Sequence, residues 1–206
     1  MTYKIYPMTL EATDKQEIKL LANVFASPKD AFEDYIKSQS FSRGNLLRIH
    51  FFLFLFAPIF KILHNLFFTF VGSVYFGFEA PPKLTEGLTT STAIYPLVLF
   101  LVYHFDILLL RLRGGEASEN AIEERDLLLI AFLPFSASSL FWIFPKPFNF
   151  FLILGSLAYS FHLSHLALRA LCGFTTKQFI VFVSYALILC MTLSALGLTI
   201  FNLVRR

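Results

Sequence analysis

Charged residues are scarce in this sequence. They account for 15% of its 206 residues, whereas roughly 25% is usual in soluble domains. The net charge is only +3, and the basic side chains are scattered among acidic ones. That charge pattern excludes a nucleic-acid-binding surface, which needs its basic side chains gathered on one face.

Cysteine is nearly absent as well. Cys172 and Cys190 lie in or beside apolar runs and have no metal-ligand spacing, so we expect packed thiols rather than a disulfide or a metal site. No motif for nucleophilic or acid–base catalysis is visible either. We therefore expect a protein without catalytic residues, metal or cofactor.

Apolar residues are what the sequence has in abundance. They make up 56% of the chain, and 27 residues are phenylalanine. An α-helix needs roughly 20 apolar residues to cross a bilayer about 30 Å thick. Runs of about that length lie at roughly 49–76, 93–110, 127–144, 148–171 and 178–203. The sequence therefore predicts an all-α fold, a polytopic membrane helical bundle with about five transmembrane helices and a short helical cytosolic N-terminal segment.

The first 45 residues differ from the rest because they are mostly polar. We expect no signal peptide in them, and we expect the first membrane helix to act as an uncleaved anchor. We divide the chain into a cytosolic amphipathic segment, 1–45, and a five-helix transmembrane domain, 46–206. The strings Thr-Asp-Lys-Gln at 13–16 and Ser-Pro-Lys-Asp at 27–30 predict two helix starts in the first segment.

The second of these N-terminal helices carries one apolar face, formed by Phe32, Tyr35 and Ile36. A short helix of this kind suits the membrane interface. It equally suits a position on the cytosolic end of the bundle itself. Both interpretations remain open from the sequence.

Local signals place the turns between the spans. Gly173 is expected to end the fourth helix, and Thr-Thr-Lys-Gln at 175–178 forms a capping box that starts the fifth. Pro-Lys-Pro at 145–147 predicts a tight turn that makes helices three and four antiparallel neighbours. Pro58 is expected to kink the first helix. A minority interpretation splits that run into a re-entrant hairpin.

Small residues recur at every fourth position on the last two helices. They are Ser156, Ser160 and Ser164 on the fourth and Ala186, Cys190 and Ser194 on the fifth. Such stripes allow close helix packing in lipid. We expect helices four and five to pack along them, and a homo-oligomer contact is the alternative.

The distribution of Lys and Arg predicts the orientation. With the N-terminus in the cytosol, most of these residues fall on the inside. The outside segments then hold only Lys83, Lys146, Arg205 and Arg206. With five spans the C-terminus lies on the opposite side, and a bacterial inner membrane is the expected location.

Ionisable side chains within apolar runs are functional candidates, because burying them in a membrane is costly. The candidates are Lys61, His64, His104, Asp106, His162 and His165. His50, Lys61, His64 and Asn65 share one helical face, which is expected to point into the bundle. These groups form either a path for protons or ions, or structural contacts with backbone, water and neighbouring charges.

The stretch from 111 to 126 is the most polar one between spans. It is a candidate partner-facing loop, with Arg113, Gly114, Gly115, Glu116, Glu123, Glu124 and Arg125 as the residues of interest. The expected partners are the lipid bilayer and other membrane or cytosolic proteins, with no nucleic acid.

In this order of features the chain resembles the Yip1 family. Ser-Pro-Lys-Asp-Ala-Phe at 27–32 is similar to the proline-led helix that precedes span one in bacterial members. The Gly114-Gly115 loop and the short turn at 173–178 also match the family's arrangement, and the resemblance covers roughly 25–203. The Asp-Leu-Tyr-Gly-Pro string of eukaryotic members is absent. The resemblance to bacterial-type members implies a five-span membrane protein and brings no catalytic residues.

We therefore expect a non-enzymatic membrane scaffold or protein-interaction module. The alternative is a small transporter or channel that uses the intramembrane polar residues. An intramembrane enzyme is a third, weaker hypothesis, since Phe161 to His165 contains an FxxxH string known from prenyl-protein proteases. Leu128 stands where the paired glutamates of those enzymes would need an arginine.

Overall fold

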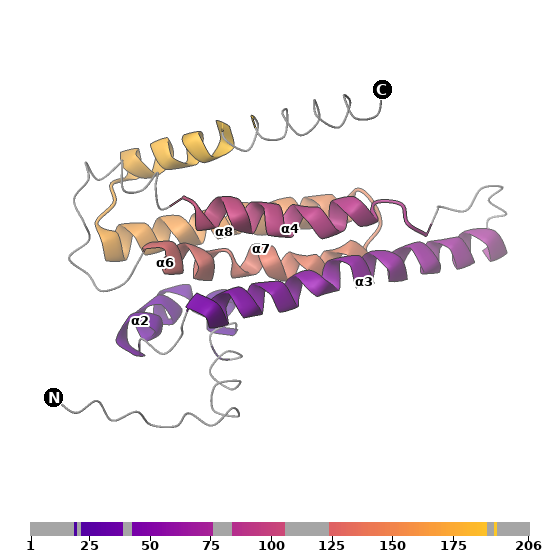
Figure 1. Cartoon of the computed structure of the whole chain (residues 1–206), viewed down its shortest axis with the longest axis horizontal. Helices are drawn as coiled ribbons and strands as arrows, with labels where there is room; N and C mark the ends of the chain where they lie inside the picture. The colour runs from indigo at the N-terminus through magenta and orange to yellow at the C-terminus, as the bar shows by residue number, and fades with distance from the viewer. Residues whose placement is uncertain are drawn as a thin grey trace.

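The computed structural model describes residues 19, 22–38, 43–75, 84–105, 124–188 and 192, and these are helical apart from short turns (Figure 1). The helices are α2 (Pro28–Ser38), α3 (Arg43–Tyr75), α4 (Leu88–Tyr103), α6 (Glu124–Ala131), α7 (Leu133–Ala137), the 3-10 helix η1 (Ser138–Ile143) and α8 (Phe148–Cys172). Residues 22–26 and 176–188 are also helical. The described part contains no strand, so the all-α prediction is confirmed.

Five apolar helical stretches overlap the five predicted runs. Three are long and apolar enough to cross a membrane, namely Arg43–Val71, Arg125–Ile143 and Phe148–Arg169. Two shorter ones are Leu88–Tyr103 and Thr176–Ile188. Their exposed side chains include many of the phenylalanines, among them Phe51, Phe52, Phe100, Phe150 and Phe151. An apolar outer surface of this kind is suited to lipid, and the molecule is a multi-pass membrane helical bundle.

The third span, built from α6, α7 and η1, is the centre of the bundle. The helices α3, α4 and α8 all contact it, and residues 127–136 are buried without exception. Figure 1 shows α6 and α7 running between α3 on one side and α4 with α8 on the other. Residues of α6 and α7 therefore face protein on every side.

This central span is broken rather than continuous. The helix is interrupted at Phe132, between α6 and α7, and continues as a 3-10 helix from Ser138. Pro134 stands next to the break, where it supplies no backbone N–H and its ring clashes with the preceding turn. A break inside a membrane is tolerated only when neighbouring helices satisfy the freed backbone groups.

The first run forms one helix. α3 continues through Pro58 from Arg43 to Tyr75, so the re-entrant hairpin interpretation is wrong. Its 33 residues correspond to about 50 Å, more than the roughly 30 Å of hydrocarbon in a bilayer. Figure 1 shows the C-terminal part of α3 extending past the ends of α4 and α8. An over-long apolar helix of this kind tilts in the membrane.

The second span is displaced from its predicted range of 93–110. α4 begins at Leu88 and its C-cap is His104. The polar residues before Ala93 enter the helix because the hydroxyls of Ser91 and Thr92 donate hydrogen bonds back to the carbonyl of Leu88, at 2.9 and 2.8 Å. Hydropathy alone underestimates how readily such residues join an apolar helix, because a hydroxyl bonded to its own helix is no longer a free polar group.

The predicted end of the fourth helix and the predicted start of the fifth are confirmed. Gly173 caps α8 with φ 65°, a left-handed conformation that favours glycine. The Thr175 N–H donates to Gln178 Oε1 at 2.9 Å, and the Gln178 N–H donates to Thr175 Oγ1 at 3.3 Å. This reciprocal pair is a capping box. A turn also lies between Ile143 and Phe148, as Pro-Lys-Pro predicted.

The N-terminal helix α2 begins at Pro28, as predicted, and lies against the bundle. It contacts α8, and Ala31 and Phe32 are buried in the same apolar core as the membrane helices. These contacts favour the bundle end over the membrane interface for α2. The side chains of Tyr35 and Ile36, and the predicted helix start at 13–16, lie outside the described residues.

Ser160, in the middle of the small-residue stripe on α8, packs against span three and not against helix five as predicted. Ser160 and Ser164 are fully buried, and Ser160 Oγ accepts a hydrogen bond from the Phe135 N–H of α7 at 3.1 Å. The prediction failed because a stripe shows that a helix approaches closely but not which helix. On the fifth helix Ala186 is buried, and Cys190 and Ser194 lie outside the described residues.

Candidate functional site

Polar side chains inside the bundle gather around the break in span three. His50 of α3 is fully buried, with Nε2 at 3.0 Å from the carbonyl oxygen of Leu129 and Nδ1 at 2.6 Å from Ser136 Oγ. A carbonyl only accepts, so Nε2 carries the proton. In the neutral ring Nδ1 then accepts the hydroxyl hydrogen of Ser136. The imidazole thus links α3 to both sides of the break.

Further hydroxyls bond to backbone groups near the same break. The Phe135 N–H donates to Ser160 Oγ at 3.1 Å. Ser139 Oγ donates to the carbonyl of Leu53 at 2.7 Å, and Ser138 Oγ donates to that of Phe135 at 2.6 Å. The first bond ties α8 to the broken span and the second ties α3 to it, whereas the third lies within the span. Each satisfies a buried backbone group.

A tyrosine–tryptophan pair completes this interior network. Tyr95 of α4 is fully buried. Its hydroxyl lies 3.0 Å from Trp142 Nε1, which donates to it, and 3.3 Å from Ser138 Oγ. All three membrane helices around span three therefore contribute one or more hydrogen bonds to it.

His50 and Ser136 have the distance of a nucleophile and its base. Catalysis by this pair would need room for a substrate carbonyl and an oxyanion site beside the hydroxyl. Both residues are buried, and the second imidazole nitrogen bonds a backbone carbonyl. The environment is that of a structural hydrogen bond.

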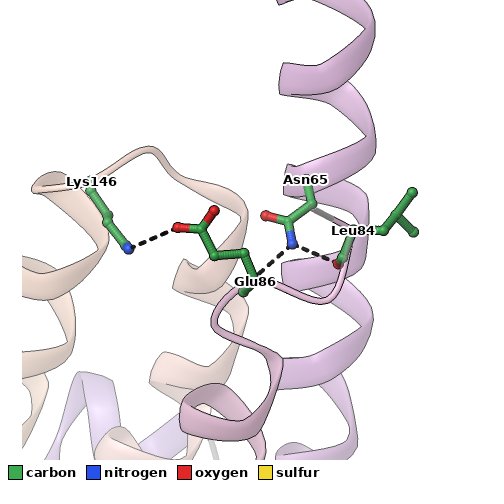
Figure 2. Close-up of polar contacts among 4 residues, drawn as sticks. All are labelled: Asn65, Leu84, Glu86 and Lys146. Carbon is green, nitrogen blue, oxygen red and sulfur yellow. Dashed lines mark hydrogen bonds and ion pairs between the residues drawn. The ribbon is translucent and has the colours of Figure 1, made fainter. Parts of the chain in front are cut away.

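A second polar group lies at the end of the bundle where α4 and α8 begin. Lys61 and Asn65 of α3 are buried there, at 3% and 2% exposure, as the shared helical face predicted. Asn65 Nδ2 donates to the carbonyls of Leu84 and Glu86, at 2.8 and 3.1 Å (Figure 2). The amide thereby holds the turn that precedes α4.

Gly87 leaves room for the side chain of Lys61 to pack against this turn. Its φ of 72° is left-handed, and an added Cβ would lie 3.0 Å from Lys61 Cε. Close by, Lys146 Nζ lies 3.8 Å from Glu86 Oε1 (Figure 2), and His64 Nδ1 lies 3.0 Å from the carbonyl of Ile143. These contacts join the turn before α4 to the turn before α8.

A third polar group lies at the opposite end. Arg43, at the start of α3, donates from Nε to Asp126 Oδ1 of α6 at 2.8 Å. The guanidinium of Arg125 lies 4.4 Å from the ring centroid of Tyr103, a cation–π contact. Arg125 is therefore engaged within the bundle, whereas the sequence had placed it on a partner-facing loop.

Three further candidate histidines lie at the end of α4 and along α8. His104 is exposed at the C-cap of α4, not about two turns inside the helix as predicted. His162 is exposed beside Tyr159, with ring centroids 6.4 Å apart. His165 packs on Phe179, at 4.6 Å. Asp106 lies outside the described residues.

The structure therefore separates the predicted polar residues into groups at opposite ends. Lys61 and His64 are at one end and His104 is at the other, whereas His162 and His165 lie along α8 between Ser160 and the helix end. Along α4 the distance from Gly87, beside Lys61, to His104 is about 25 Å at 1.5 Å per residue. Between these two ends lies the interior network, whose side chains bond to the backbone and to one another.

The loop candidates are described only in part. Arg113, Gly114, Gly115, Glu116 and Glu123 lie outside the described residues. Glu124 begins α6, and nothing further is described of its side chain. Within the described residues, no three His, Cys, Asp or Glu side chains gather closely enough to hold a metal ion.

Sequence reasoning missed Tyr95, Trp142 and Ser139 as members of the interior network. One signal was available. Span three combines Pro134 with Ser136, Ser138 and Ser139, and a proline in a membrane helix calls for hydroxyls that satisfy the freed backbone. The residues on other helices that form hydrogen bonds with this span carry no such signal in the sequence.

Comparison with known proteins agrees with this architecture. No curated protein and no solved structure matches the chain. The model of the Yip1 domain matches residues 22–197, a range that includes every labelled helix from α2 to α8. The chain therefore belongs to the Yip1 domain family.

Proposed function

We propose that this Yip1 domain protein is a non-enzymatic membrane scaffold that presents its cytosolic end to other membrane or cytosolic proteins. One observation carries the proposal: polar side chains in the interior of the bundle hold the broken third span to the helices around it. His50, Ser139 and Ser160 each bond a backbone group of another helix. Side chains committed in this way stabilise one packing arrangement and offer nothing to a substrate.

The proposed orientation places the end with α2, Arg43 and Asp126 in the cytosol. The excess of Lys and Arg in segments on that side supports it. Segment 1–45 and the loop up to Asp126 then form the docking surface, 46–206 forms the membrane domain, and a bacterial inner membrane is the location. α2 already rests on this end through Phe32, and its Lys29 is highly exposed.

In-membrane cross-linking tests the scaffold role. A photoactivatable amino acid replaces Lys29 on α2 in one variant and Lys146 at the other end in a matched control. Both side chains are exposed, at 84% and 66%. Irradiation of intact cells is expected to give discrete protein adducts from position 29 and few from position 146. Adducts from position 146 alone would contradict the proposed docking end.

The transporter alternative is favoured by a single observation, the buried ammonium of Lys61. A proton-flux assay in liposomes separates the two functions. We expect flux equal to that of empty liposomes for the wild type, for Lys61→Met, and for the exposed control Lys177→Met. A flux that Lys61→Met abolishes while Lys177→Met preserves it would replace the scaffold with a transporter.

A further inference from the structure

An apolar groove of about 470 Å³ lies between α4 and α8, with Phe135 and Trp142 at its base. The walls are formed by Ile94 and Val98 of α4 and by Ile153 and Leu157 of α8. This volume lies within the range of small-molecule sites, roughly 300–1,000 Å³. Neighbouring residues Leu97 and Phe100 are exposed on the same helix, so the groove opens on the side of the bundle that faces lipid.

The groove is confined to one leaflet. Its lining runs from Thr90 to Val98 on α4 and from Asn149 to Leu157 on α8, which is about 12 Å on each helix at 1.5 Å per residue. Both helices begin at the same end of the bundle, so the groove starts there and ends less than halfway across a hydrocarbon layer of about 30 Å. Its length and walls suit part of one acyl chain.

The mouth of the groove has a different chemistry. Lys146 and Asn149 line it at the start of α8, where the positive end of the helix dipole adds to the lysine charge. Glu86 lies 3.8 Å from Lys146 Nζ, but both side chains are more than half exposed, and a pair of that kind is held weakly. The ammonium can therefore turn to a stronger anion.

Asn149 is a second observation that points to a ligand, separate from the shape of the groove and the charge of Lys146. The residue is 2% exposed, and among the described residues none donates a hydrogen bond to its buried Oδ1. A buried carbonyl oxygen of this kind is costly unless a donor meets it. A lipid head group that carries a hydroxyl or an ammonium would supply that donor beside the lysine.

We propose that the groove between α4 and α8 binds one phospholipid of the surrounding bilayer, with an acyl chain along Ile94 and Leu157 and its phosphate against Lys146. The head-group donor meets Asn149 Oδ1. The site rests on the membrane location of the bundle and holds whether the chain is a scaffold or a transporter.

Photo-cross-linking in nanodiscs tests this site. The full chain is reconstituted with phosphatidylglycerol that carries a diazirine in the middle of one acyl chain, and adducts are mapped by peptide mass spectrometry. Adducts are expected to concentrate on the groove walls of α4 and α8. Filling the groove with Ile94→Trp is expected to reduce them about tenfold, whereas Ile59→Trp on the lipid-facing side of α3 leaves them unchanged.

The head-group contact has its own test, which does not depend on tolerance of a bulky side chain. A diacylglycerol with the same diazirine lacks the phosphate and is expected to label the groove about threefold less. Lys146→Gln should remove that difference, Asn149→Leu should reduce labelling by phosphatidylglycerol, and Lys177→Gln at the opposite end should change nothing. Adducts spread evenly over the exposed faces of α3, α4 and α8, or equal labelling by both probes in the wild type, would overturn the proposal.

Discussion

At the scale of single residues, the interior of this bundle is governed by the cost of an unpaired polar group in a membrane. His50 meets Leu129 and Ser136, which are 79 and 86 residues away in the chain. Each bond pairs polar groups that would otherwise be buried in an apolar interior. A buried histidine of this kind could suggest proton transfer when only the sequence is known. In the structure it forms hydrogen bonds that hold the broken helix in place.

This account predicts energetic coupling between His50 and Ser136. Ser136→Ala leaves Nδ1 of His50 without a donor and is expected to lower the free energy of unfolding by about 1–2 kcal/mol. A double-mutant cycle with His50→Phe should give a coupling energy of about 0.5–2 kcal/mol, measured by reversible unfolding in mixed micelles. His162→Phe, on an exposed histidine, serves as the control and should show no coupling to Ser136. Strictly additive effects of the first pair would count against the bond.

At the scale of the element, the broken third span depends on its neighbours. Ser160→Ala removes the acceptor of the Phe135 N–H and is expected to cost about 1–2 kcal/mol of unfolding free energy. Ser156→Ala is the matched control one turn away. Its hydroxyl bonds only to Leu152 of the same helix, at 2.9 Å, so we expect a change within about 0.5 kcal/mol. Equal losses in the two variants would contradict the role of α8 in supporting the break.

The end of α8 allows a cleaner comparison between two glycines. An added Cβ at Gly173 or at Gly155 meets nothing within 4 Å, so only the backbone differs. Gly173→Ala places a side chain at φ 65° and should cost about 1 kcal/mol. Gly155→Ala lies within the helix and should be neutral or stabilising by up to about 1 kcal/mol. Thermal unfolding followed by circular dichroism measures both, and a stabilising Gly173→Ala would contradict the assigned cap.

At the scale of the whole molecule, the sequence predicts what depends on neighbouring residues. The apolar runs, the Gly173 cap and the capping box at 175–178 are local patterns, and the structure confirms them. Pairs distant in the chain were not predictable, because the packing register decides that Ser160 faces Phe135 and that Trp142 reaches Tyr95. The early start of α4 has a local cause, since the hydroxyls of Ser91 and Thr92 bond to the carbonyl of Leu88.

The candidate site shows the same division. Helical periodicity correctly predicted a shared buried face for Lys61 and Asn65. It could not reveal that Lys61 and His104 lie at opposite ends, because the relative depth of two helices depends on the turn between them. The separation of these groups by a membrane-thick bundle is the central claim of the account.

Cysteine accessibility tests that claim most directly. In a background without Cys172 and Cys190, Lys146→Cys and Lys177→Cys each introduce one exposed thiol, before and after the 25 residues of α8. A membrane-impermeant maleimide is applied to intact cells and to inverted vesicles. We predict that position 146 reacts only from outside and position 177 only from the cytosolic side. Labelling of both positions from the same side would show that α8 does not cross the membrane and would contradict the account.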